Sequence, residues 1–250
     1  MNGSAATSNS YLGTEKISKL IIKLALPTVT AQIVNMLYNL VDRIYIGNID
    51  IIGEKALTGL GVCQPIILFI AAFSALICYG GAPKSAIAMR EGNYKKAEKI
   101  LSGCFTAQIA VSLILTVVFS IWHREFLMLF GASPDTIDYA CEYIKIYVLG
   151  TVFVEIALGM SAFITAQGFA SVSMKTVLIG AVCNIILDPV FIFLFDMGVK
   201  GAALATVISQ GVSTVWVLVF MFGKKPVLRM RKENIVPDFG LLFSCIALGL

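Results

Sequence analysis

Residues 101–122 read LSGCFTAQIAVSLILTVVFSIW, a run of 22 residues without a charged side chain. A transmembrane helix needs roughly 20 predominantly apolar residues, so this run is long enough to cross a lipid bilayer. The whole chain shares this character, because 58% of its residues are hydrophobic and 14% are charged. Soluble domains carry about 25% charged residues. The composition therefore predicts an all-α integral membrane protein whose main surroundings are the lipid bilayer.

Five more apolar stretches of similar length flank this run, which predicts six spans in total. The six predicted spans are residues 20–46, 57–80, 101–122, 143–163, 176–195 and 202–222. We expect a polar tail over residues 1–15, a six-helix transmembrane bundle over 16–222 and a basic linker over 223–238. Residues 239–250 become apolar again, and we expect them to begin a seventh helix that is truncated. The tail has no apolar core or cleavage site, so no cleavable signal peptide is expected.

The basic residues alternate between the two sides of the predicted bundle. Most of the 19 basic residues lie before the first span, in alternate loops, or after the sixth span. Cytoplasmic loops are enriched in Lys and Arg, so this pattern predicts a multi-pass protein of the cell inner (plasma) membrane with a cytoplasmic amino terminus. The net charge of +4 follows from these loops. No nucleic-acid partner is expected, and we expect a monomer.

The first predicted span carries a stripe of polar residues. They recur every third or fourth residue, which places them on one face of a helix. In a lipid-embedded helix such a face lines a cavity or hydrogen-bonds to neighbouring helices. Both interpretations stay open from the residues alone. The stripe consists of Thr28, Gln32, Asn35, Asn39 and Asp42.

The fifth predicted span contains Asn184 and Asp188, one helical turn apart and followed directly by Pro189. Proline lacks a backbone N–H and so frees a carbonyl oxygen one turn back. These oxygens could form a pocket for a proton or a hard cation, or the side chains could simply cap a proline break. Asp42, Asp188 and Thr206 of the sixth span are all expected roughly 7–10 Å below the outer surface. They can therefore converge at one depth.

Glu155 lies near the middle of the fourth predicted span. A buried carboxylate in a membrane is costly, so we expect Glu155 to pair with another helix or to line a cavity. The six cysteines are scattered singly and the chain has one histidine, His123, which gives no metal-binding spacing. We expect no catalytic residues and no enzymatic activity.

Several short motifs give the chain a family resemblance. They are VDRIYIG at 41–47, SAF at 161–163, AQG at 166–168, NIILDP at 184–189 and GVKGAALAT at 198–206. In their order and placement the chain, over residues 15–250, resembles the multidrug and toxic compound extrusion (MATE) family, in its bacterial MepA-like branch. The resemblance implies the amino-terminal half of a twelve-helix transporter, a six-helix lobe facing a second lobe across a cleft.

The resemblance also implies a function and a set of site residues. Such proteins are secondary active multidrug efflux transporters that export organic cations or amphipathic drugs in exchange for Na⁺ or H⁺, with no cofactor besides that ion. The family's coupling residues fall on Asp42, Asn184, Asp188 and Thr206, which could hold Na⁺ or a proton. We expect the substrate cavity to be lined by Gln32, Asn35, Met36, Tyr38, Asn39 and Glu155.

Two other functions are weighed against this one. A lipid-linked oligosaccharide flippase of the same broad superfamily would need several cavity arginines for a pyrophosphate cargo. The predicted spans offer only Arg43, near a helix end. An intramembrane enzyme such as a prenyl transferase would need an Asp-rich metal motif or HExxH, and the sequence has neither.

Overall fold

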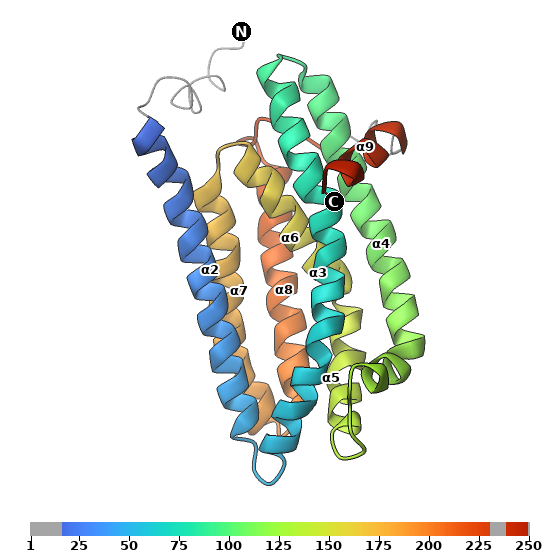
Figure 1. Cartoon of the computed structure of the whole chain (residues 1–250). Helices are drawn as coiled ribbons and strands as arrows, with labels where there is room; N and C mark the ends of the chain where they lie inside the picture. The colour runs from blue at the N-terminus through green and yellow to red at the C-terminus, as the bar shows by residue number, and fades with distance from the viewer. Residues whose placement is uncertain (1–16, 231–238, 250) are drawn as a thin grey trace.

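The computed structural model describes residues 17–230 and 239–249, and this part of the chain is built from helices without strands. Figure 1 shows long helices running alongside one another, with the short helix α9 lying across one end. The predicted all-α fold is confirmed. The elements are α2 (Ile17–Gly47), α3 (Gly53–Arg90), α4 (Tyr94–Leu129), α5 (Ile137–Leu149), α6 (Thr151–Ala166), α7 (Ala170–Pro189), the π-helical turn η1 (Val190–Leu194), α8 (Val199–Met221) and α9 (Phe239–Gly249).

Each predicted span lies within one helix or one consecutive pair of helices. Four of the described helical segments are long and apolar enough to cross a membrane: α3, α4, α7 with η1, and α8. The pair α5–α6 is a fifth if it counts as one span, although it is bent by 59°. α2 is not among these four. At 31 residues α2 is still roughly 46 Å long, which exceeds the thickness of a bilayer core.

The second and third spans extend well beyond their predicted bounds. α3 has 38 residues and α4 has 36, and only three residues separate them. Gly92 takes a positive φ of 76° in this turn, and the side chain of Asn93 accepts a hydrogen bond from the Lys96 N–H at 3.1 Å. This N-cap allows α4 to begin directly after the turn. The hydropathy pattern located only the apolar part of each helix.

The fourth predicted span is broken in the middle, which the sequence analysis did not anticipate. The break lies at Gly150, between α5 and α6. A Cβ atom at Gly150 would lie 2.7 Å from the Val207 side chain, so α8 crosses this point at close range. Only a residue without a side chain permits that approach.

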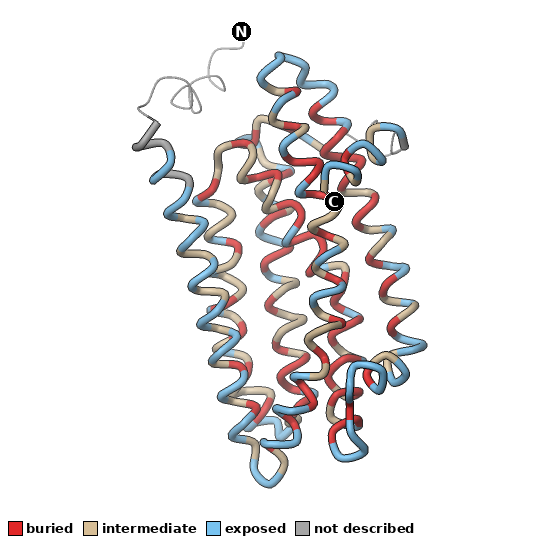
Figure 2. Tube along the Cα trace, in the orientation of Figure 1, coloured by how far each residue is buried: buried red, intermediate tan, exposed pale blue. Residues whose placement is uncertain are grey.

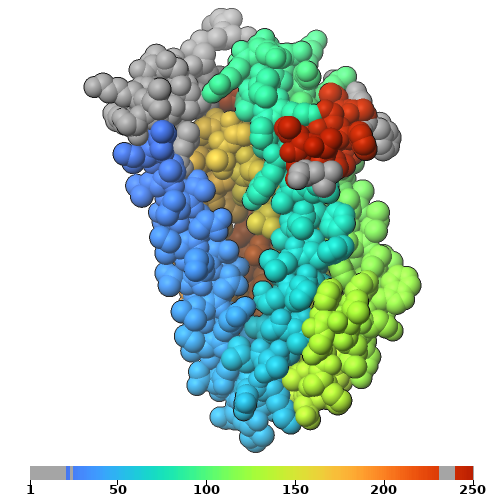
Figure 3. Space-filling model, in the orientation of Figure 1, coloured from blue at the N-terminus to red at the C-terminus, as the bar shows by residue number. Residues whose placement is uncertain are grey.

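The packing leaves one side of the bundle open. Figure 2 shows buried residues concentrated on α3 to α8, whereas α2 is largely exposed. α2 packs mainly against α7 and makes few contacts with α3. Figure 3 shows a hollow between α2 and α3, with later helices visible at its bottom. The fold therefore holds α2 as one wall of a cleft.

The segment after α8 is fastened to the bundle by Gln167, to which the sequence analysis assigned no role. Leu228 is fully buried, and its N–H donates to Gln167 Oε1 at 3.0 Å. Gln167 is itself 2% exposed and follows α6 directly. Residues 223–230 of the predicted linker are thus held against the bundle. The predicted tail 1–15 and residues 231–238 lie outside the described residues, while 239–249 form α9, which lies against α3.

Replacing Gln167 by leucine should loosen this segment. The substitution leaves the buried Leu228 N–H without its acceptor, a loss of about 1–3 kcal/mol. We expect trypsin to cut faster after the exposed residues Lys224 and Arg229 of the protein in detergent. Gln64→Leu, on α3, is the matched control and should leave the cleavage rate unchanged. Equal cleavage of both variants and wild type would show that Gln167 does not hold this segment.

Candidate functional site

Four polar residues from three helices meet near the end of the bundle where α2 and α7 end and α8 begins. Asn184 on α7 donates through Nδ2 to Asp188 Oδ1 at 3.2 Å and, at a long 3.5 Å, to Thr206 Oγ1 on α8. The carboxyl group of Asp42 on α2 lies within hydrogen-bonding reach of the Asp188 carboxyl group. The structure therefore brings together Asp42, Asn184, Asp188 and Thr206, the four residues named as the coupling set.

These side chains are buried and have unused oxygen atoms. Asp42 is 7% exposed, Asn184 is 2% exposed and Asp188 is fully buried. Among the described residues, Asp42 Oδ1, Asn184 Oδ1 and Asp188 Oδ2 have no hydrogen-bond donor. Buried acceptors without partners are costly, and two neighbouring carboxylates add repulsion. A proton or a hard cation such as Na⁺ would satisfy these oxygens, so the donor set fits either ion.

The end of α7 explains why these residues can meet. Pro189 has no N–H to continue the α-helical ladder. The chain passes into the wider turn η1, where the Phe195 N–H donates to the Val190 carbonyl, five residues back, at 2.9 Å. α8 then begins against this turn, because a Cβ at Gly201 would lie 2.6 Å from the Phe191 carbonyl carbon. This contact fixes the start of α8, and with it Thr206, beside Asn184.

Two tyrosines of α5 also belong to this region, and the sequence analysis missed them. Tyr143 and Tyr147 are 3% and 5% exposed, and their rings stack with centroids 6.0 Å apart. The Tyr143 side chain lies close to Thr206. Their spacing of one helical turn was the available signal. Aromatic residues at a membrane helix end are common anchors, so this spacing alone does not indicate a site.

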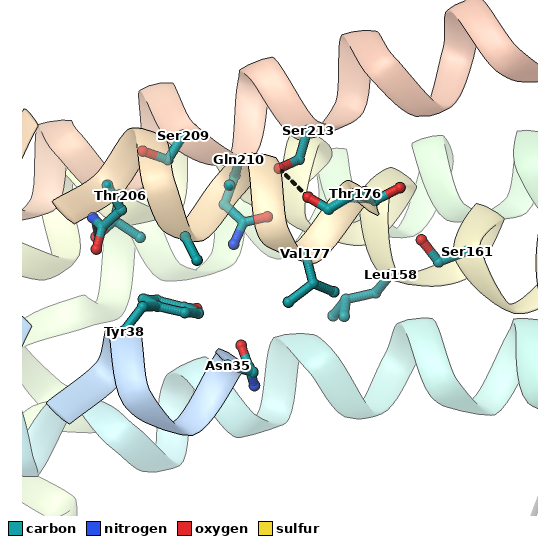
Figure 4. Close-up of a pocket in the computed structure, with 14 residues that line it drawn as sticks. Asn35, Tyr38, Leu158, Ser161, Thr176, Val177, Thr206, Ser209, Gln210 and Ser213 are labelled. Carbon is teal, nitrogen blue, oxygen red and sulfur yellow. Dashed lines mark hydrogen bonds between the residues drawn. The ribbon is translucent and has the colours of Figure 1, made fainter. Parts of the chain in front are cut away.

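Two cavities extend from this site along the cleft. The smaller, of about 100 Å³, has Asn184 and Thr206 on its wall, and the larger, of about 560 Å³, continues toward the end of the bundle where α6 meets α7. Leu158, Ser161 and Val177 line both cavities, so they form one path. Figure 4 shows Asn35 and Tyr38 of α2 facing the polar residues of α7 and α8 across the smaller cavity.

Three of the predicted cavity residues line these cavities. Gln32 lies on the wall of the larger cavity, and Asn35 and Tyr38 lie on the wall of the smaller one. The polar stripe of α2 therefore faces a cavity over this part of its length, rather than only contacting neighbouring helices.

The other three predicted cavity residues are not on the wall of either cavity of this lobe, so their place in a substrate cavity stays a prediction. Met36 is 72% exposed, because a helix turns by about 100° per residue and carries Met36 away from the face of Asn35. Asn39 is exposed and donates to the Asn35 carbonyl of its own helix at 2.7 Å. Glu155 is fully buried between helices.

Thiol labelling can test the path of the cleft. Ser161→Cys should react with a water-soluble maleimide, because Ser161 lines both cavities. Val182→Cys should react at least about tenfold more slowly, because Val182 lies exposed on an apolar face of α7 that suits lipid. The native cysteines supply little background, since five of the six are buried. Equal labelling of the two variants would show that the cleft does not hold water.

Comparison with known proteins agrees with this architecture. The sequence model of the MatE family matches residues 27–190. The chain is 25% identical over 240 residues to the multidrug export protein MepA of Staphylococcus haemolyticus, covering 96% of this chain and 53% of that protein. It thus spans about half the length of the curated relatives it matches.

Solved structures share the fold. A MATE structure in a straight conformation matches with a TM-score of 0.88 at 22% identity, covering 97% of this chain and 54% of that one. A MOP superfamily transporter from Pyrococcus furiosus matches with a TM-score of 0.88 at 22% identity, over 97% of this chain and 53% of that one. The apolar helices and these matches make the protein a multi-pass membrane protein. Because the family match covers more than half of its residues, the chain belongs to the MatE family.

Proposed function

We propose that the chain forms the amino-terminal lobe of a secondary active multidrug efflux transporter, which exchanges organic cations or amphipathic drugs for Na⁺ or H⁺. The observation that carries this proposal is the group of three buried, partnerless oxygens at the end of a cleft. The relatives named as multidrug export proteins support it. Their greater length makes the second lobe, and so the complete activity, part of the proposal.

The ion site suggests how coupling works. Asp42 belongs to α2, and its partner Asp188 belongs to α7, the helix that holds α2 in the bundle. An ion bound between the two carboxylates removes their repulsion and draws α2 toward α7. Loss of the ion favours a different position of α2. A ligand shifts a conformational equilibrium only through different affinities for its states, and this site provides such a difference.

The larger cavity suggests the class of cargo. Its volume of about 560 Å³ falls within the range of small-molecule sites. Among the described residues its wall has no charged side chain and combines apolar residues with Gln32, several hydroxyl groups and the ring of Tyr79. A flat cation with an apolar body fits this wall, since aromatic faces attract cations. The ion site and the larger cavity both include residues of α2. A movement of α2 caused by ion binding would therefore change the affinity of the cavity for its cargo.

The remaining expectations stay part of the proposal. We place the amino terminus in the cytoplasm and the protein in the plasma membrane, as a monomer without enzymatic activity. Neither cavity has an arginine on its wall among the described residues. A pyrophosphate-linked cargo would need such residues. The flippase alternative is therefore not favoured.

The proposal can be tested in proteoliposomes that contain this lobe joined to the second lobe that the proposal requires. A fluorescent cationic dye is followed while a Na⁺ gradient or a pH gradient is imposed separately. Dye movement driven by one gradient and abolished when that gradient is collapsed supports antiport and names the ion. Absence of movement under both gradients, with the protein shown to be folded by its thermal transition, contradicts the proposed activity.

A further inference from the structure

Glu155 is a fully buried acid that the proposed transport site does not use. It lies on α6, about one turn beyond the break at Gly150, and is 0% exposed. Both carboxyl oxygens, Oε1 and Oε2, lack a hydrogen-bond partner among the described residues. Neither of the two cavities of the cleft has Glu155 on its wall. The group is thus separate from the cleft and from the Asp42–Asp188 pair.

The polar groups around Glu155 serve its backbone rather than its carboxyl group. Ser74 Oγ on α3 and Gln108 Nε2 on α4 both donate to the Glu155 carbonyl, at 3.1 and 2.9 Å. Gln108 Nε2 also donates to Ser74 Oγ at 2.8 Å. Gly159 makes room for this contact, because a Cβ there would lie 1.8 Å from Gln108 Nε2. The three helices are therefore joined at this point without help from the carboxyl group.

No cation balances the carboxyl group among the described side chains. The ionisable group recorded beside it is the Tyr147 hydroxyl of α5. α3 and α4 contribute only the buried thiols of Cys78 and Cys104 near this level. The basic residue of α8 is Lys200, which pairs with Glu142 at 3.2 Å. The ionisable residues of α7 are Lys175 and Asp188, and Asp188 already interacts with Asp42. The described ion pairs do not include Glu155.

An ionised carboxylate in these surroundings would be strongly unfavourable, because burying a charge without a partner is costly in protein and in membrane. A metal cation would need several oxygen ligands and space to hold them. A proton needs neither. The break between α5 and α6 is a second indication, since interrupted membrane helices often supply ion sites.

We propose that Glu155 is a proton-binding site, separate from the Asp42–Asp188 pair and occupied at neutral pH. The neutral acid lets α6 pack against α3 and α4. Loss of the proton would leave a charge that only water could solvate, so it would require water to enter at the α5–α6 break. This inference does not depend on which substrate is transported, or on transport at all.

Infrared spectroscopy of the purified protein tests the proposal directly. A protonated carboxyl group without hydrogen bonds has a carbonyl stretch well separated from that of carboxylates. Protein made with isotope-labelled glutamate should show this band, shifted by the label, at neutral pH. Glu155→Gln should remove it. Glu142→Gln, which changes a half-exposed ion-paired glutamate, should leave it in place.

The proposal is overturned if the labelled wild type lacks the band, or if the band survives in Glu155→Gln. It is also overturned if adding Na⁺ without a change of pH removes the band, because the site would then bind a metal cation. Should Glu155→Gln fail to fold, Glu155→Asp serves as the second variant and must lose the glutamate-sensitive band. Because no transport is measured, failure here is distinct from failure of the antiport proposal.

Discussion

Replacing either Asp42 or Asp188 by asparagine is expected to reduce ion-driven dye export by roughly ten- to a hundredfold. The change keeps the size of the side chain but removes the charge that a proton or Na⁺ would neutralise. The two states of α2 then lose their difference in ion affinity, and coupling energies of this kind typically amount to about 1–3 kcal/mol. The measurement is dye movement in proteoliposomes under the gradient that drives the wild type.

Asp50→Asn provides a matched control for this experiment. Asp50 lies in the turn after α2, is exposed, and undergoes the same chemical change. It should transport at the wild-type rate. Dye binding without a gradient should persist in all three variants, since the larger cavity contains neither carboxylate. Undiminished transport by both Asp42→Asn and Asp188→Asn would rule out the acid pair as the coupling site.

Gly201→Ala is expected to lower the melting temperature by roughly 5 °C, although alanine is the better helix former. The added Cβ would meet the backbone of Phe191 at 2.6 Å, and backbone atoms cannot turn away as a side chain can. Overpacking of this kind costs about 1–3 kcal/mol, which corresponds to a few degrees in a chain of this size. Because this contact sets the start of α8 beside η1, ion-driven transport should fall as well.

Gly61→Ala is the control for the same change. Gly61 lies within α3, and a Cβ there would have nothing within 4 Å. Here the higher helix propensity of alanine acts alone, and the melting temperature should rise by about 2 °C. Both values can be read from the intrinsic fluorescence of Trp122 and Trp216 during heating. A Gly201→Ala variant as stable as Gly61→Ala would show that α8 does not need this close approach.

The residues of the proposed ion site could be singled out from sequence because two simple signals agreed. Asn184 and Asp188 share a face of one helix, and the hydropathy boundaries placed them at the depth of Asp42 and Thr206. In the structure, the helices that carry these residues, α2, α7 and α8, pack against one another. Tyr143 was not found, because its position near Thr206 depends on how α5 packs against α8, which no local pattern specifies.

The features that the sequence did not reveal within the helices have a common physical origin. Met36 and Asn39 belong to an otherwise cavity-facing stretch of α2, but helix rotation and a hydrogen bond within the helix keep them off the walls of the two cavities of this lobe. The break at Gly150 could not be predicted, because a glycine inside an apolar run can mark either a bend in a helix or a close contact with a neighbouring helix. Periodicity gives the face of a helix, whereas the neighbouring helix decides which part of that face meets a cavity.

The length of α3 and α4 has a practical consequence. α3 is roughly 57 Å long, and the part of α4 before its kink at Trp122 is roughly 42 Å long. Both exceed the roughly 30 Å core of a bilayer, so part of this hairpin must lie outside that core. The turn at its tip is short and capped by Asn93, which makes it a stiff joint rather than a loose loop. A folded domain inserted into this turn would be carried on α3 and on the 28-residue stretch of α4 that precedes the kink at Trp122. The turn between α3 and α4 is thus a suitable fusion site for a folded domain that helps to align images of a small membrane protein in electron microscopy.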